Sequence, residues 1–202
     1  MTDKAPYEGA IEESAKAASK ALDLVKASSQ QIADVYGILI GDPLHAARHR
    51  RLDAITRRTQ EILRERDAKT TELPEQIAIP LLEAAQQESR TEMQEIWARL
   101  LANAMDTDRA ADVRPEFVAA LQKLQPLDAL LLQEARALVQ NPNQATVDPK
   151  IFADRLSIRE TLAAVSIENL VIARCLSRHL SGQTDYYRLA GFGIELLHAC
   201  RP

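Results

Sequence analysis

The sequence predicts a mainly α-helical protein: a helical bundle over residues 1–110, followed over residues 115–202 by a winged-helix-like module with one short β-hairpin. Composition is the first reason, because 32 Ala and 26 Leu stand against 6 Gly and 4% aromatic residues, which favours helices over a sandwich or barrel. Apolar residues also recur at helical spacing along most of the chain. A turn signal followed by strand-like composition appears near the end.

The first half of the chain predicts an Ala-rich helix and then a basic helix. A thin stripe of small apolar residues indicates a helix over residues 9–29. The basic helix is expected over residues 43–66, with Asp42 as its N-cap and Pro43 in its first turn. Its apolar face comprises Leu52, Ile55, Ile62 and Leu63, with Thr59 among them.

The clearest helix contains the single tryptophan. Ser89-Arg90-Thr91-Glu92 has the form of a capping box, and seven apolar residues from Met93 to Met105 then follow helical spacing. Trp97, Leu100 and Leu101 are therefore predicted to lie in the core. A short helical turn is expected over residues 75–79, between Pro74 and Pro80, and Pro80 suits the first turn of a helix over residues 81–87.

The C-terminal half of the sequence predicts four helices, a hairpin and a final helix. Prolines 115, 126 and 149 suit first helical turns, with Asp148 as an N-cap. Ser157 and Glu160 repeat the capping-box spacing, and Ser166 is a candidate cap for a helix over residues 167–175. The hairpin pairs residues 176–180 with 185–189.

Charge singles out the basic helix. Residues 44–69 carry 8 basic and 4 acidic side chains, whereas residues 70–114 carry 4 and 9. At 100° per residue, Arg50, Arg57 and Arg64 point away from the apolar face. The candidate partner-binding face therefore consists of Arg50, Arg51, Arg57, Arg58 and Arg64. A solvated face, or salt bridges to the acidic 70–114 segment, is the alternative interpretation.

The predicted helix over residues 167–175 occupies the position of a DNA-reading helix in winged-helix folds. Asn169 and Arg174 are its candidate contacts. Its apolar content and the module's balance of 9 basic and 9 acidic residues favour packing or protein contact instead.

Motifs for catalysis or cofactor binding do not emerge from the sequence. His45 and His49 are four residues apart, but a third ligand at metal-binding spacing is missing. We predict no catalytic residue, no metal and no cofactor. The two cysteines, Cys175 and Cys200, fit buried thiols in a reducing cytoplasm, and no apolar run is long enough to span a bilayer.

Several stretches together resemble the bacterial abortive infection alpha family. They are KAASKALDLVKA (Lys16–Ala27), GDPL (41–44) before the arginine-rich helix, IPLLEAA (79–85), EIWARLLANAMD (95–106), PEFVAALQKLQP (115–126) and YRLAGFGIELLHAC (187–200). The resemblance implies a cytoplasmic, mostly helical bacterial protein associated with defence against phage, and it assigns no catalytic residues.

Three functional hypotheses follow. The first is a non-catalytic phage-defence protein that works through protein contacts, with a phage component or a second copy of the chain as partner. The second is an immunity protein or antitoxin whose acidic 70–114 segment faces a basic toxin. The third is a winged-helix DNA-binding regulator; nucleic acid is the weaker partner, and a membrane role is not expected.

Overall fold

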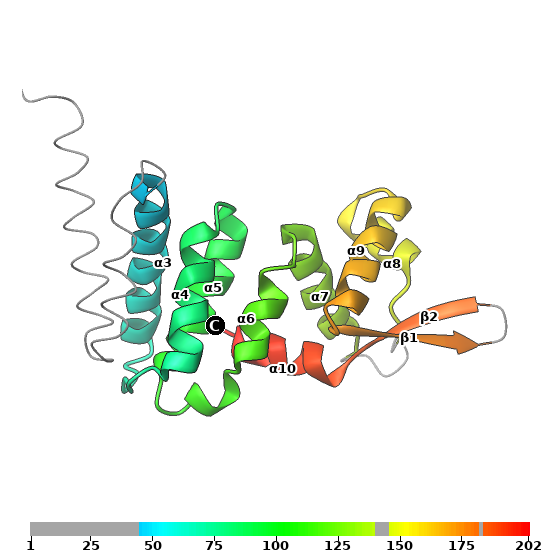
Figure 1. The fold of residues 1–202 in the computed structure, drawn as a ribbon. Coiled ribbons are helices and arrows are strands. Elements are labelled where there is room, and N and C mark those ends of the chain that lie inside the picture. Colours follow the sequence, from blue (N-terminus) through cyan, green and yellow to red (C-terminus); the bar gives the residue numbers. More distant parts are fainter. Residues whose placement is uncertain (1–44, 140–145, 182–183) are drawn as a thin grey trace, which may run out of the picture. The chain divides into compact units, whose positions relative to one another are not determined.

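The computed structural model describes residues 45–139, 146–181 and 184–202. It divides into two compact units: one ends at Val118 and takes in Pro202, and the other is Ala119–Arg201. The described residues form eight α-helices, one 3-10 helix and one two-stranded sheet (Figure 1). The prediction of a mainly helical protein with a single short hairpin is confirmed. The predicted helix over residues 9–29 and the Asp42–Pro43 cap lie outside the described residues.

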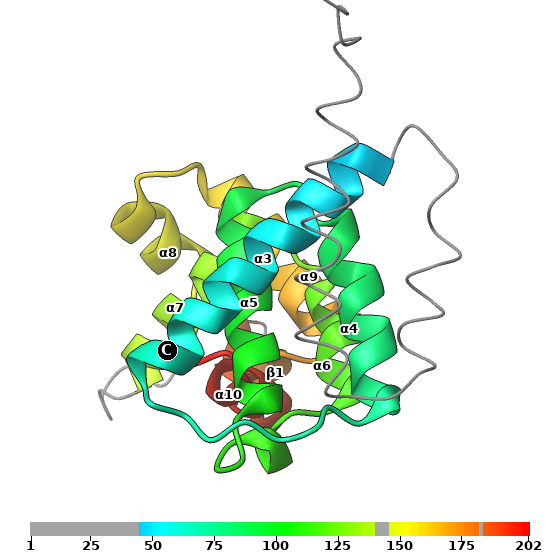
Figure 2. The ribbon, with the colours of Figure 1, turned by 90° about the vertical axis from the view of Figure 1, so that its left-hand side faces the viewer.

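The first unit is built on three packed helices. Its elements are α3 (His45–Glu65), α4 (Glu75–Gln87), α5 (Thr91–Met105) and the 3-10 helix η1 (Ala110–Asp112). Both α4 and α5 pack against α3, and Figure 2 shows α3 crossing α5 with α4 beside it. The predicted core residues Trp97, Leu100 and Leu101 are buried, as is the apolar face of α3. The periodicity read from the sequence therefore places the correct faces inward.

The start of α5 differs from the predicted capping box. The helix begins at Thr91 with Arg90 as N-cap, and the cap makes no side-chain hydrogen bond. Buried Glu88 fixes the entry instead, because its Oε1 accepts the Arg90 backbone N–H at 2.8 Å and its Oε2 pairs with the Arg90 guanidinium at 2.6 Å. The Gln94 side-chain amide also donates to the Glu88 carbonyl at 2.9 Å. The contacts of Glu88 with Arg90 and Gln94 therefore fix the start of α5 in place of the predicted Ser89 cap.

The start of α4 also corrects the prediction. Pro80 lies inside the helix, which begins at Glu75 with Pro74 as N-cap. The first turn is already closed upstream, because the N–H groups of Ile77 and Ala78 donate to the Pro74 carbonyl at 2.9 Å. Pro80 cannot donate to the carbonyl of Gln76 four residues earlier, but Gln76 is exposed, so water can satisfy that acceptor.

The second unit surrounds its own apolar centre. The boundary falls inside α6 (Pro115–Leu121), and the remaining elements are α7 (Pro126–Val139), α8 (Pro149–Leu156), α9 (Glu160–Ile172), β1 (Leu176–Ser181), β2 (Thr184–Leu189) and α10 (Gly191–Ala199). β1 and β2 pair antiparallel with Leu176 opposite Leu189, close to the predicted strands. The buried centre includes Leu131, Phe152, Ile167, Leu170 and Leu196.

Helix boundaries in the second unit confirm one sequence signal and correct two. Asp148 caps α8 as predicted, its carboxylate accepting the Lys150 N–H at 2.8 Å. Ser157 is instead the left-handed C-cap of α8, with φ 53°, and α9 begins at Glu160 after Arg159. Ser166 lies buried in the middle of α9 and caps nothing. Because apolar residues continue on both sides of Ser166, the helix runs through it.

The turn from α9 into β1 is tight. Arg174 has φ 64°, and the Cys175 N–H closes the turn by donating to the Leu170 carbonyl at 2.8 Å. Gly193 of α10 packs directly on this turn: a Cβ built there would lie 3.0 Å from the Cys175 Cα and nearer still to its carbonyl oxygen. A glycine is therefore required at this crossing.

Candidate functional site

The outward face of α3 is the candidate surface that the sequence predicted. Arg50, Arg57 and Arg64 are exposed, whereas Leu52 and Ile55 on the other side of the same helix are 3% and 1% exposed. A helix with one buried row keeps the opposite row in solvent. The three arginines therefore lie where the sequence placed them.

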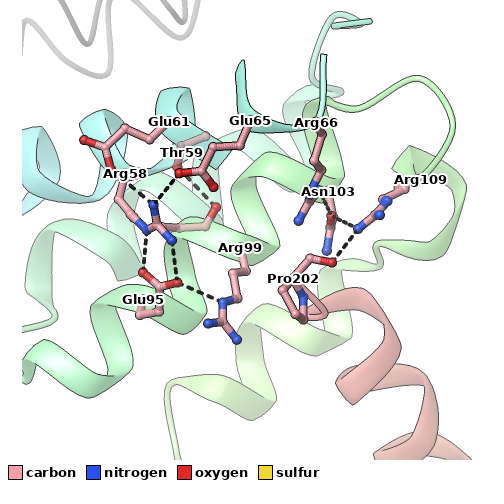
Figure 3. A network of polar contacts seen from close by, with 11 residues as sticks. Arg58, Thr59, Glu61, Glu65, Arg66, Glu95, Arg99, Asn103, Arg109 and Pro202 are labelled. Atoms are coloured by element: carbon pink, nitrogen blue, oxygen red, sulfur yellow. Dashed lines mark hydrogen bonds and ion pairs between the residues drawn. The ribbon is translucent and has the colours of Figure 1, made fainter. Parts of the chain in front are cut away.

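Arg58 belongs to a network between helices and not to the open face. Its Nε and Nη2 donate to the two carboxylate oxygens of Glu95 on α5, at 2.9 and 3.3 Å (Figure 3). Its Nη1 faces Glu61 and Glu65 of its own helix at 3.2 and 3.5 Å, and Arg99 donates to Glu95 at 2.9 Å. For Arg58, the alternative interpretation therefore holds: the side chain forms salt bridges to the acidic 70–114 segment.

Electrostatics in this network favour the charged forms of its members. Partial burial raises the pKa of Glu95, but hydrogen bonds from Arg58 and Arg99 outweigh it and bring that pKa below its usual range. The hydrogen bond to Glu95, helped by Glu61, raises the pKa of Arg58. The paired charges hold α3 against α5 through a two-pronged guanidinium contact.

The other arginines of the predicted face are more available to a partner than Arg58 is. Arg57 pairs with Asp53 one turn away at 2.8 Å. Because the Arg57 side chain is largely exposed, this pair has small energetic weight. Arg50, Arg51 and Arg64 take part in no ion pair within the described residues; Arg51 is half-buried and the other two are exposed. We call Arg50, Arg51, Arg57 and Arg64 the α3 arginine surface.

A second polar network, which the sequence did not reveal, joins the ends of α3 and α5. Asn103 is 1% exposed, and its Oδ1 accepts from Arg66 at 2.7 Å and from Arg109 at 3.3 Å (Figure 3). Both arginines also face Asp106, at 3.9 and 3.7 Å, and Arg109 donates to the Pro202 carbonyl at 3.0 Å. The i,i+3 spacing of Asp106 and Arg109 was the available signal, but it could not identify Asn103 as their shared partner.

The two candidate DNA-contact residues do not share a helical reading face. Asn169 lies on α9 and is half-buried, with its amide 3.5 Å from the Asp128 carboxylate. Arg174 lies beyond the end of α9, and its guanidinium sits 5.0 Å from the centre of the Phe192 ring. The predicted helix over residues 167–175 therefore has the wrong bounds: α9 begins at Glu160, and its last helical residue is Ile172.

Asp128 explains why Asn169 points inward. The carboxylate is 1% exposed and lies in the first turn of α7, where it accepts the Gln125 backbone N–H at 2.8 Å. This contact caps the helix start from within, and the positive end of the helix favours the negative charge.

Burial, with a smaller effect of the Asp128 charge, raises the pKa of the Cys175 thiol to about 12.

Other surface features bear on the class of protein. In the part of the chain that the structure describes, no three His, Cys, Asp or Glu residues are grouped to hold a metal ion. Asp53, four residues after His49 in the sequence, pairs with Arg57. Among the same residues, no helix has both the length and the apolar character needed to cross a bilayer. Leu162, Val165 and Ile172 leave an apolar row exposed on α9.

These observations define a mainly helical protein with a C-terminal hairpin, a charged helix surface in one unit and an exposed apolar helix face in the other. The family model described as abortive infection alpha matches residues 47–179, which is 133 of the 202 residues. The chain therefore belongs to the abortive infection alpha family, as the sequence resemblance indicated, and is associated with abortive infection. Comparisons with curated proteins and with solved structures gave no significant match.

Proposed function

We propose that this chain is a phage-defence protein of the abortive-infection type that acts in the cytoplasm through protein contacts and without catalysis. Family membership supports the association with defence. The α3 arginine surface carries the contact mechanism, because it presents guanidinium groups outward from a helix whose other side is fixed in the core. Guanidinium groups form rigid forks that suit carboxylates.

The chemistry of this surface favours a protein face, with carboxylates opposite the arginines, as the partner. Exposed Glu61 and Glu65 lie on the same helix as the arginines, and Asp53 pairs with Arg57. A nucleic-acid backbone would meet these carboxylates with repulsion, whereas a protein face can present charges of both signs. Electrostatic complementarity of this kind gives specificity and speeds encounter.

The two other hypotheses gain less from the described residues. For a winged-helix DNA-binding regulator, the apolar outer row of α9 offers no phosphate ligand, and Asn169 is engaged with Asp128. For an immunity protein or antitoxin, Glu88 and Glu95 of the acidic segment are taken up by internal ion pairs. Arg58 lies outside that segment, so its ion pair with Glu95 offsets part of the segment's net negative charge.

Phage plating on bacteria that express the protein tests the proposal. The variant is Arg50→Glu with Arg64→Glu, chosen because neither side chain has an ion pair in the described residues. The control is Arg114→Glu with Lys123→Glu, two exposed residues off α3, which changes the net charge by the same amount. We expect the wild type and the control to reduce plaque counts and the α3 variant to lose that protection.

Each part of the proposal has its own contrary outcome. Equal plaque counts with and without the wild-type protein, over a broad phage panel, would contradict a defence function. Full protection by a folded α3 variant would contradict the contact surface. Circular dichroism of the purified variants establishes that they are folded.

A further inference from the structure

One face of the β1–β2 hairpin carries a group of polar and aromatic side chains. Residues directly opposite one another in an antiparallel pair lie on the same face, and successive residues of a strand alternate between faces. The register pairs Ser177 with Arg188 and His179 with Tyr186, so these four side chains share a face, whereas Leu176, which is 3% exposed, lies on the other. In Figure 1 the hairpin extends beyond the helices of its unit. We call Ser177, His179, Tyr186 and Arg188 the hairpin cluster.

The members of the hairpin cluster hold one another in position. The His179 and Tyr186 rings stack with their centroids 5.3 Å apart and their planes at 19°. The Arg188 guanidinium carbon lies 5.2 Å from the centre of the Tyr186 ring, within the range of a cation–π contact. The Ser177 hydroxyl lies 2.9 Å from His179 Nε2. The two rings and the cation are therefore oriented before a ligand binds.

The charge of Arg188 is not neutralised by these contacts. The side chain is exposed, and it takes part in no ion pair among the residues that the structure describes. A ring face attracts the guanidinium without carrying a net charge, so the guanidinium can still bind an anion through its N–H donors. The hairpin cluster therefore places an available positive charge next to a stacked aromatic pair.

The His179 ring can extend the stack. Tyr186 covers one face of the imidazole, and within the described part of the chain no second aromatic ring or cation contacts it. His179 is also partly exposed. A flat group of a ligand can therefore stack against the outer side of the imidazole.

A nucleotide combines the two features that the hairpin cluster complements. Its phosphate carries the negative charge that a guanidinium binds, and its base has a π-face that stacks on aromatic side chains. A carboxylate on a protein face would engage Arg188 but would give the stacked rings no role. Bases within a duplex are already stacked on each other, so a single strand is the form that offers both a phosphate and a free base face.

We propose that the hairpin cluster binds single-stranded nucleic acid, RNA or DNA, with Arg188 on a phosphate and a base stacked on the His179–Tyr186 pair. Ser177 keeps the imidazole oriented for this contact. The site does not use α9, so it differs from the predicted DNA-reading helix, and it lies in a different unit from the α3 arginine surface.

Fluorescence anisotropy tests the phosphate contact, with labelled oligo(U) and oligo(dT) of about 12 nucleotides over a salt series; binding of either strand supports the proposal. We expect Arg188→Gln to weaken binding and to reduce the slope of log K against log salt concentration by about 0.7, as for one phosphate contact on a single strand. Arg178→Gln is the matched control, because Arg178 is exposed on the same hairpin but on the opposite face. It removes the same charge and should leave the slope nearly unchanged.

Two substitutions of Tyr186 test the stacking contact. Tyr186→Leu keeps an apolar side chain on β2 but removes the ring, so we expect binding to weaken about 5-fold or more. Tyr186→Phe keeps the ring and should retain most of the affinity. Circular dichroism of each variant establishes that it is folded.

Several outcomes would overturn the proposal. One is a wild type that binds neither oligonucleotide at low salt, and another is tighter binding of a duplex of the same length. A folded Tyr186→Leu variant that binds as the wild type does would refute the stacking. Loss of binding in Arg50→Glu with Arg64→Glu, while Arg188→Gln binds normally, would place the site on α3 instead. These measurements are independent of the plaque counts that test the proposed function.

Discussion

Replacement of Trp97 by alanine should destabilise the first unit severely. The indole is 1% exposed in the middle of α5, so folding removes nearly its whole surface from contact with water. With about 200 Å² of aromatic surface buried at about 25 cal/mol per Å², the transfer free energy is about 5 kcal/mol. Alanine keeps a small part of that burial, so we expect a loss of about 3–5 kcal/mol in the free energy of unfolding.

Urea unfolding followed by far-UV circular dichroism measures this loss, with Trp97→Phe as a control that keeps a ring and should lose less. Because the chain has one tryptophan, fluorescence of the wild type reports on the first unit alone and identifies its transition. A loss below about 1 kcal/mol would place Trp97→Ala among ordinary surface substitutions. The assignment of Trp97 to the core would then be refuted.

Three further predictions concern the packing and the charges. Gly193→Ala should lower the melting temperature, because its Cβ would overlap the Cys175 carbonyl, whereas Gly191→Ala, with open space around its Cβ, should be neutral or slightly stabilising; equal melting temperatures would contradict the close packing. Glu95→Gln should reduce stability at neutral pH by about 1–2 kcal/mol. Because the folded-state pKa of Glu95 is lowered, its contribution is complete above the unfolded pKa of about 4.3 and is lost as the pH falls through the folded pKa; a difference from the variant that persists in acid would argue against the ion pair. The buried Cys175 thiol, with its pKa raised to about 12, should resist alkylation in native Cys200→Ser protein and react once the protein unfolds, as mass spectrometry can measure.

The sequence was most informative where the physical signal is local. Apolar spacing placed Trp97 and the buried face of α3 inside, and the same geometry placed Arg50 and Arg64 outside. Asp148 followed by proline marked the start of α8, because the cap and the helix it closes are neighbours in the chain.

The sequence was least informative where a partner is distant in the chain. Arg58 meets Glu95 across 37 positions, and no local pattern distinguishes it from its exposed neighbours. Ser166 shows a second limit: the same residue type that caps a helix can also lie buried within one. Family resemblance supplied the functional class, whereas the surfaces emerged only when helices were packed.

Thr59 has a consequence for how α3 can be positioned along α5. Its hydroxyl is fully buried and lies 2.8 Å from the Ile55 carbonyl and 3.2 Å from the Ala98 carbonyl of α5. The apolar rows of Leu, Ile and Ala on the two helices repeat after one turn. A shift of α3 along α5 by about 5.4 Å would therefore still place apolar side chains against apolar side chains. Such a shift would break the hydroxyl contact that Thr59 makes with both helices and would separate Arg58 from Glu95. These two polar contacts therefore select one alignment of α3 on α5 among several of similar packing.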